Sequence, residues 1–156
     1  MSGLDLALAA AAIVLAAALA VALVRRRPPR RLPVSAGARR VLVPFSGTLD
    51  ETVLAAAIRI ARAEEAVLVP AYLLIVPLRY GEDSPLSDEV KLAMPLLEAV
   101  EHAALRAGVA VDARIEKGRT LTHALRRLWE VERFDRIVAP APVNGGGGFT
   151  EKELAW

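Results

Sequence analysis

The sequence predicts an α/β fold in which a single N-terminal transmembrane helix precedes a doubly wound parallel-sheet domain. Two observations lead to this prediction. A long uncharged apolar run lies near the start, and the remainder alternates short apolar runs with amphipathic helical patterns. Strands that alternate with helices imply a parallel sheet with right-handed crossovers. We therefore expect three parts, which are a membrane anchor over 1–27, a Pro- and Arg-rich linker over 28–37 and an α/β domain over 38–156.

The first element is predicted to be an uncleaved membrane anchor. Nineteen residues from Leu6 to Val24 are apolar, and about 20 residues at ~1.5 Å each span the hydrocarbon core of a bilayer. Five arginines lie between Arg25 and Arg31 and none precedes the run. A signal peptide would carry its positive charge first, and a core helix would show a polar stripe, so both alternatives are disfavoured.

The arginines also predict the orientation, because an excess of Lys and Arg marks the cytoplasmic side of a membrane. We expect a single-pass protein of the cell (inner) membrane with its N-terminus outside and its C-terminal domain in the cytoplasm. The contact with the lipid bilayer is expected from Leu4 to Val24.

The α/β domain opens with a strand and a helix. Arg40–Phe45 is a short apolar run of the kind found in buried parallel strands. Thr48–Glu51 has the pattern of a capping box and predicts a helix through about Ala63. The next strand region is Val67–Val76. Because Pro70 is unfavourable inside a central strand, we expect pairing only from Tyr72 to Val76.

The rest of the domain continues the alternation. A helical pattern over Asp88–Ala107 contains Pro95, which either kinks the helix or marks its first turn, and Gly108 is expected to end it. The remaining expected elements are a half-exposed edge strand over 109–115, a helix over 120–132, a fourth strand over 136–139, a flexible loop over 145–148 and a capping box over 150–153. Unless something else completes the sheet, the fourth strand is expected to be left at an open edge.

The composition excludes several functional classes. The chain has no cysteine, which excludes disulfides and thiol nucleophiles. The arginines beside the anchor exceed the net charge of +2, so the domain is near neutral and no nucleic-acid partner is expected. His102 and His123 are the only histidines, and they lack metal-ligand spacing. The sequence therefore predicts no catalytic residue and no metal site.

Three segments resemble the universal stress protein family. Arg40–Thr48 looks like the opening strand and turn of that family, Gly118 like the glycine before its third helix, and Phe134–Val138 like its Asp-x-Ile-Val strand. The resemblance covers about 38–156. It implies a doubly wound α/β layer that commonly dimerises through a fifth strand, which would lie beyond Trp156.

The resemblance also implies an ATP site, and the chain departs from the family motif at three places. Ser46 stands where the family has the Asp that ends its opening strand. The glycine loop that should follow the fourth strand meets Pro140 instead, and its closing Gly-Ser/Thr would fall past Trp156. The candidate ligand-binding residues are Phe45, Ser46, Gly47, Thr48, Gly145, Gly147 and Gly148. A plain turn and cap at 46–48 and a flexible linker at 145–148 are the competing interpretations.

The sequence thus favours a membrane-tethered, cytoplasmic, universal stress protein-like regulatory or interaction module that is not an enzyme and needs no cofactor. One alternative is a stress sensor that binds a nucleotide, namely ATP. Another is an accessory subunit of a larger membrane protein complex. The expected partners are the bilayer and either a membrane protein or a second copy in a homodimer.

Overall fold

The computed structural model describes residues 37–81, 86–142 and 148–154 of the 156-residue chain. The predicted anchor over 1–27, and the predicted linker except Gly37, lie outside the described residues. Among the helices that the structure describes, none has the length and apolar character needed to span a bilayer.

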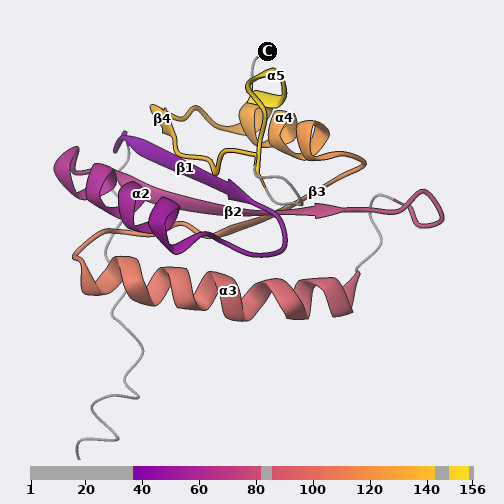
Figure 1. Ribbon diagram of the computed structural model, residues 1–156, viewed down its shortest axis with the longest axis horizontal. Coiled ribbons are helices and arrows are strands. Elements are labelled where there is room, and N and C mark those ends of the chain that lie inside the picture. The colour runs from indigo at the N-terminus through magenta and orange to yellow at the C-terminus, as the bar shows by residue number, and fades with distance from the viewer. Residues whose placement is uncertain (1–36, 82–85, 143–147, 155–156) are drawn as a thin grey trace, which may run out of the picture. The chain divides into compact units, whose positions relative to one another are not determined.

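The described part contains a four-stranded parallel sheet and four helices, labelled as in Figure 1. The strands are β1 (Arg40–Phe45), β2 (Val67–Ile75), β3 (Arg114–Gly118) and β4 (Arg136–Ile137). The helices are α2 (Glu51–Ala63), α3 (Ser87–Arg106), α4 (Leu121–Val131) and α5 (Glu151–Leu154). The strand order is β3-β2-β1-β4. The prediction of a parallel α/β sheet with the fourth strand at an edge is therefore confirmed, but β4 covers only the first half of the predicted range 136–139.

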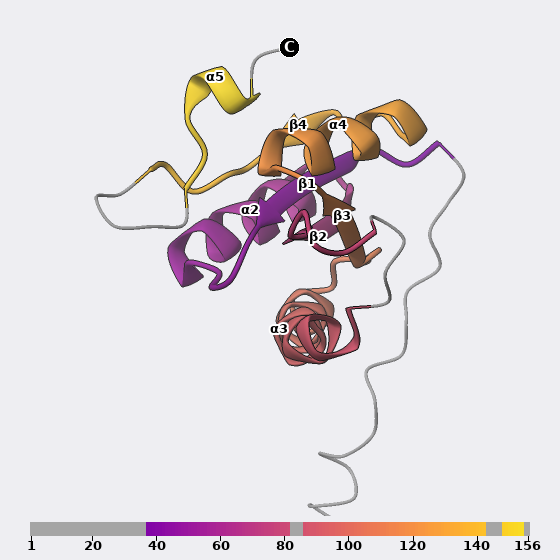
Figure 2. The same cartoon turned by 90° about the vertical axis from the view of Figure 1, so that its right-hand side faces the viewer.

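Helices cover both faces of the sheet, as Figure 2 shows, with α2 and α3 on one side and α4 and α5 on the other. Successive side chains of a strand point to opposite faces. Val41 and Val43 of β1 accordingly pack with Ala57 of α2, whereas Leu42 packs with Leu125 of α4. The near-continuous apolar run of β1 follows from this burial on both faces.

β2 is paired over more of its length than the sequence predicted. The expectation that only Tyr72–Val76 would be paired is wrong, because β1 is in register with β2 from Val67 to Tyr72. The residue that led to this error, Pro70, lies fully buried in the middle of the strand.

Pro70 is tolerated because the N–H that it lacks would point away from β1. The Leu68 N–H donates to the Ala110 carbonyl on the β3 side, and polar groups of alternate residues in a strand point the same way. The ladder toward β3 is therefore the one that breaks. An isolated bridge joins Leu68 to Val111, and regular pairing resumes only at Arg114. The predicted strand over 109–115 is therefore wrong in its bounds, since β3 runs from Arg114 to Gly118 and shares only Arg114 and Ile115 with it.

The ends of the later helices agree with the sequence prediction. α3 ends before Gly108, whose φ of +77° is the left-handed conformation expected after a helix. Pro95 lies inside α3, so the alternative that it marks the first turn is wrong. Thr150 and Glu153 form the predicted capping box, since each side chain accepts a hydrogen bond from the backbone N–H of the other.

Candidate functional site

The candidate site lies at the carboxyl edge of β1 and β4. The chain adds β2 and β3 on one side of β1 and then places β4 on the other, so the strand order reverses between β1 and β4. Open α/β sheets bind ligands at such a switch point. The predicted segment Phe45–Thr48 contains the last residue of β1 and the turn after it (Figure 1), and Gly148 comes after β4 along the chain. Gly145 and Gly147 lie outside the described residues, so their predicted role stays untested.

The turn after β1 contains one core residue and three accessible residues. Phe45 is fully buried, and its ring packs edge-on against Tyr72 with centroids 5.4 Å apart. Ser46 is half-buried, while Gly47 and Thr48 are exposed. The φ of Gly47 is +77°, a conformation that favours glycine. A ligand could therefore contact Ser46, Gly47 and Thr48. Phe45 is a core residue and is not accessible to it.

The N-terminus of α2 is already occupied by a carboxylate. Asp50, and not the predicted Thr48, is the N-cap, and its Oδ1 accepts hydrogen bonds from the N–H of Thr52 at 2.7 Å and of Val53 at 3.3 Å. The prediction of a Thr48–Glu51 capping box is therefore wrong, because the turn at Gly47 delays the start of the helix.

The cap changes what the turn can bind. Backbone hydrogen bonds from Thr52 and then Val53 lower the pKa of Asp50 below 3.8, so this carboxylate is ionised at neutral pH. Glu51 adds an acidic residue to the same first turn. A helix N-terminus attracts phosphate through free N–H groups, and here two of them already bond an anion. This end of α2 is therefore poorly arranged for a nucleotide phosphate.

After β4, the segment at Gly148–Phe149 packs closely against the backbone at Pro140–Ala141. The Phe149 N–H donates to the Pro140 carbonyl at 2.9 Å, and the Phe149 side chain is buried in the core beneath α4. A Cβ atom at Gly148 would lie 2.2 Å from the Ala141 carbonyl oxygen. Gly148 is therefore required by this close backbone approach, which is a structural role that the sequence did not predict.

At the end of β3, Arg119 forms hydrogen bonds that were not predicted from the sequence. Its Nη1 donates to the carbonyl oxygens of Val76 at 3.2 Å and Pro77 at 2.8 Å. Its backbone N–H donates to His123 Nδ1 at 3.3 Å, and the His123 N–H donates to Thr120 Oγ1 at 3.1 Å. The N-terminus of α4 is thus capped as well. An arginine directly after a strand-ending glycine was the only signal in the sequence.

Gly118 has a structural reason of its own. A Cβ atom at this position would lie 2.6 Å from the backbone nitrogen of Ala124 in α4. The resemblance to the family at Gly118 therefore reflects the close packing of α4 on the end of β3. No contact with a ligand is needed to explain the glycine.

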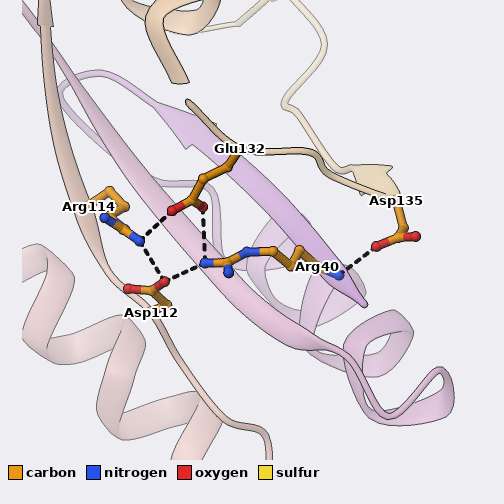
Figure 3. A network of polar contacts seen from close by, with 5 residues as sticks. All are labelled: Arg40, Asp112, Arg114, Glu132 and Asp135. Carbon is orange, nitrogen blue, oxygen red and sulfur yellow. Dashed lines mark hydrogen bonds and ion pairs between the residues drawn. The ribbon is translucent and has the colours of Figure 1, made fainter. Parts of the chain in front are cut away.

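The amino edge of the sheet carries a charge cluster that the sequence prediction also missed (Figure 3). Arg40 contacts Asp112 and lies 3.0 Å from Glu132. Arg114 lies 2.9 Å from Asp112 and 2.7 Å from Glu132. The backbone N–H of Arg40 donates to Asp135 Oδ2 at 2.8 Å. Figure 3 shows four side chains converging, those of Arg40, Asp112, Arg114 and Glu132, whereas Asp135 lies apart at the backbone of Arg40.

In this amino-edge cluster, opposite charges pair with one another, as in a cluster with a structural role. The hydrogen bond with Asp112 is the main cause that raises the pKa of Arg114 above its usual value, so the guanidinium stays charged. Arg40 and Arg114 each face Asp112 and Glu132, so the charges of these four side chains balance within the cluster. Within the described residues, no group of three His, Cys, Asp or Glu side chains is arranged to hold a metal ion.

Comparison with solved structures relates the fold to universal stress proteins. UspA from Lactobacillus plantarum superposes with a TM-score of 0.55 at 18% identity, covering 71% of this chain and 83% of that protein. A universal stress protein in complex with cAMP gives 0.51 at 21% identity, covering 65% and 75%. No protein family model matches the chain, and no curated protein matches it. The likeness shows that the described domain has a universal stress protein-like α/β fold.

Proposed function

We propose that this protein is a membrane-tethered, cytoplasmic, universal stress protein-like module that regulates or holds a partner protein and catalyses no reaction. The observation that carries the proposal is the capped N-terminus of α2 at the β1–β4 switch point. Its N–H groups at Thr52 and Val53 bond Asp50, and the acidic first turn repels a further anion.

The tether is supported by the sequence alone. The run Leu6–Val24 has the length and composition of a membrane span, and the arginines from Arg25 onward follow it directly. The full chain is therefore expected in the membrane fraction and to resist extraction with alkaline carbonate. A chain that lacks 1–27 is the matched control and is expected in the soluble fraction. Full chain recovered in the soluble fraction would remove the tether from the proposal.

The absence of a nucleotide role is tested by thermal unfolding of the full chain in detergent, with Mg-ATP, cAMP or inorganic phosphate. A ligand that binds only the folded state stabilises it by RT ln(1 + [L]/Kd), about 2.7 kcal/mol at 100 times Kd. The module is expected to show no shift with 1 mM of any of these ligands. A saturable upward shift with a nucleotide, absent with phosphate, would favour a sensor.

The second candidate function is that nucleotide-binding sensor. The exposed Gly47 and Thr48 and the half-buried Ser46 favour it, since they leave a turn open at the switch point. One of the similar structures is a universal stress protein in complex with cAMP. Under this alternative, Ser46→Trp would abolish a nucleotide-induced shift, whereas Thr122→Trp, at a half-buried position on α4, would leave it intact.

A further inference from the structure

Helices α2 and α3 are separated on their outer side by an apolar groove of about 520 Å³. Glu51 of α2 and Arg106 of α3 are its charged lining residues. Its apolar lining comes from Leu49 in the turn before α2 and from residues of both helices, namely Leu54, Ala55, Ile58, Leu96, Ala99, Val100 and Ala103. A groove of this kind, open to solvent and walled by two parallel helices, accepts a third helix.

One wall of the groove continues into an apolar stripe on α3, whose residues are exposed or half-buried. Residues spaced by three or four positions share one face of a helix, and α3 has an apolar residue at four successive positions of this kind. We call Leu92, Leu96, Ala99 and Ala103 the α3 stripe. Leu92 is 71% exposed, which is high for a leucine on a helix whose other face is buried in the core.

The α3 stripe is complementary to itself when a second α3 is laid against it in the opposite direction. If the midpoint lies between positions 97 and 98, Leu92 of one copy faces Ala103 of the other, and Leu96 faces Ala99. Each leucine thus meets an alanine. Every contact occurs twice, as two-fold symmetry requires, and large residues fill the space that small ones leave.

The same antiparallel alignment brings opposite charges together at the two ends of the α3 stripe. Asp88 is one turn before Leu92 and Arg106 is one turn after Ala103, so each Asp88 faces an Arg106 of the other copy. Arg106 forms no ion pair with another described residue. Asp88 pairs with Lys91 at 3.0 Å, but the two side chains are 90% and 74% exposed, and exposed pairs of this kind are weak. Antiparallel helices also bring each acidic N-terminal turn beside a C-terminus.

We propose that a second copy of this chain docks in the α2/α3 groove, with α3 of each copy lying antiparallel against α3 of the other. The inference rests on the proposed function and specifies its partner, since it makes the interaction module a two-fold dimer. Leucine faces alanine and Asp88 faces Arg106 across the interface. The sheet edges at β3 and β4 take no part in it.

Cysteine cross-linking tests the alignment, because the chain has no cysteine of its own. Leu92→Cys and Ala103→Cys are placed on separately tagged full-length copies, which are co-expressed and then treated with a mild oxidant. A mixed disulfide dimer is expected. Either variant expressed alone should give none, because two Leu92 positions would lie about 16 Å apart along the helices at ~1.5 Å per residue, and a disulfide needs Cα atoms within about 7 Å.

Glu98→Cys paired with Leu92→Cys is the matched control, since Glu98 is exposed on another side of α3. This combination is expected to give no mixed dimer. Absence of the Leu92–Ala103 product overturns the proposal. Equal cross-linking by each variant alone, or by the Glu98 control, overturns it too, since either result indicates nonspecific association.

Charge exchange provides a second test in the same cross-linking assay. Asp88→Arg in both copies, or Arg106→Asp in both copies, is expected to reduce the mixed dimer several-fold. Both substitutions together should restore it. A double variant that stays as weak as the single variants would contradict the Asp88–Arg106 pairing.

Fractionation of the cross-linked sample separates this inference from the proposed function. Cross-linked dimer in the soluble fraction would keep the interface and remove the tether. Membrane-bound protein without cross-link would keep the tether and remove the interface.

Discussion

The two edges of the sheet use their charged residues differently. At the amino edge, Arg40 and Arg114 face Asp112 and Glu132 in a cluster of opposite charges. At the carboxyl edge, where ligands of open α/β folds bind, Asp50 is directed at its own backbone. The difference teaches that charged side chains at the amino edge pair with one another across long sequence separations, whereas Asp50 at the carboxyl edge binds its own helix. The pairing at the amino edge is incomplete, since the Nε atoms of Arg40 and Arg114 are buried without a hydrogen-bond partner among the described residues. Under our proposal, the module acts through a surface outside these two edges.

The largest expected effect comes from filling the close approach at the carboxyl edge. In Gly118→Ala the new Cβ would lie 2.6 Å from the backbone nitrogen of Ala124, so α4 has to shift. Overpacking of this kind costs about 1–3 kcal/mol. Urea unfolding followed by circular dichroism measures the change. Gly47→Ala is the control, since its Cβ meets nothing within 4 Å, and its effect should reflect only the positive φ. An equal loss in both variants would contradict the role of close packing.

The second-largest effect is the loss of stability expected when the amino-edge cluster is broken. Arg114→Met keeps much of the apolar stem but leaves Asp112 and Glu132 with one arginine fewer. Breaking a buried pair costs 3–5 kcal/mol, but the Arg114 side chain is 41% exposed, so about 1–2 kcal/mol is expected after solvent screening. Urea unfolding at low and high salt measures the loss, which should shrink at high salt.

Arg136→Met is the matched control for the amino-edge cluster. Arg136 pairs with Glu64 at 3.1 Å, but its side chain is 61% exposed, and such pairs contribute about 0–1 kcal/mol. A loss in Arg136→Met as large as in Arg114→Met would show that the cluster adds nothing beyond an ordinary surface pair.

The third effect is a pH dependence at the carboxyl edge. Two backbone hydrogen bonds lower the pKa of Asp50 in the folded state below 3.8. A group with a lowered folded pKa stabilises the protein above its unfolded pKa, and this stabilisation is lost as the pH falls through the folded value. Asp50→Asn keeps a good N-cap but does not titrate. The melting temperature of the native chain should therefore fall relative to Asp50→Asn below about pH 3.8, and a constant difference between pH 7 and pH 2.5 would contradict this.

Much of the fold could be predicted from local patterns. The apolar run of β1, the helical spacing in α2 and α4 and the capping box at Thr150–Glu153 each depend on neighbouring residues. Pairing across Pro70 could not be predicted in this way, because it depends on which side of β2 the missing N–H faces. That direction is known only once β1 and β3 are placed.

The candidate site was predictable only in its position. The sequence placed Ser46–Thr48 after the first strand, and the topology confirms that this turn lies at the switch point. The choice of Asp50 over Thr48 as the N-cap depends on the backbone turn at Gly47. The amino-edge cluster joins Arg40 to Asp112 and Glu132, which are 72 and 92 positions away along the chain, and no local pattern relates residues at such separations.

The smallest expected effect is a gain of phosphate binding when Asp50 is replaced. It tests whether the Asp50 carboxylate keeps phosphate away from the N-terminus of α2. Asp50→Gly removes the negative charge and releases the N–H groups of Thr52 and Val53, while glycine stays an acceptable N-cap. Free N–H groups at a helix N-terminus attract anions, so this variant should gain a weak stabilisation by millimolar phosphate in thermal unfolding.

Asp50→Asn separates the two causes, because it removes the charge but keeps the side-chain acceptor that engages the N–H groups. Stabilisation by phosphate in Asp50→Gly alone would show that the occupied N–H groups exclude the anion. Stabilisation in both variants would assign the exclusion to charge. If neither variant responds, Asp50 is not what keeps this edge free of phosphate, and the contrast between the two edges would lose its chemical basis at α2.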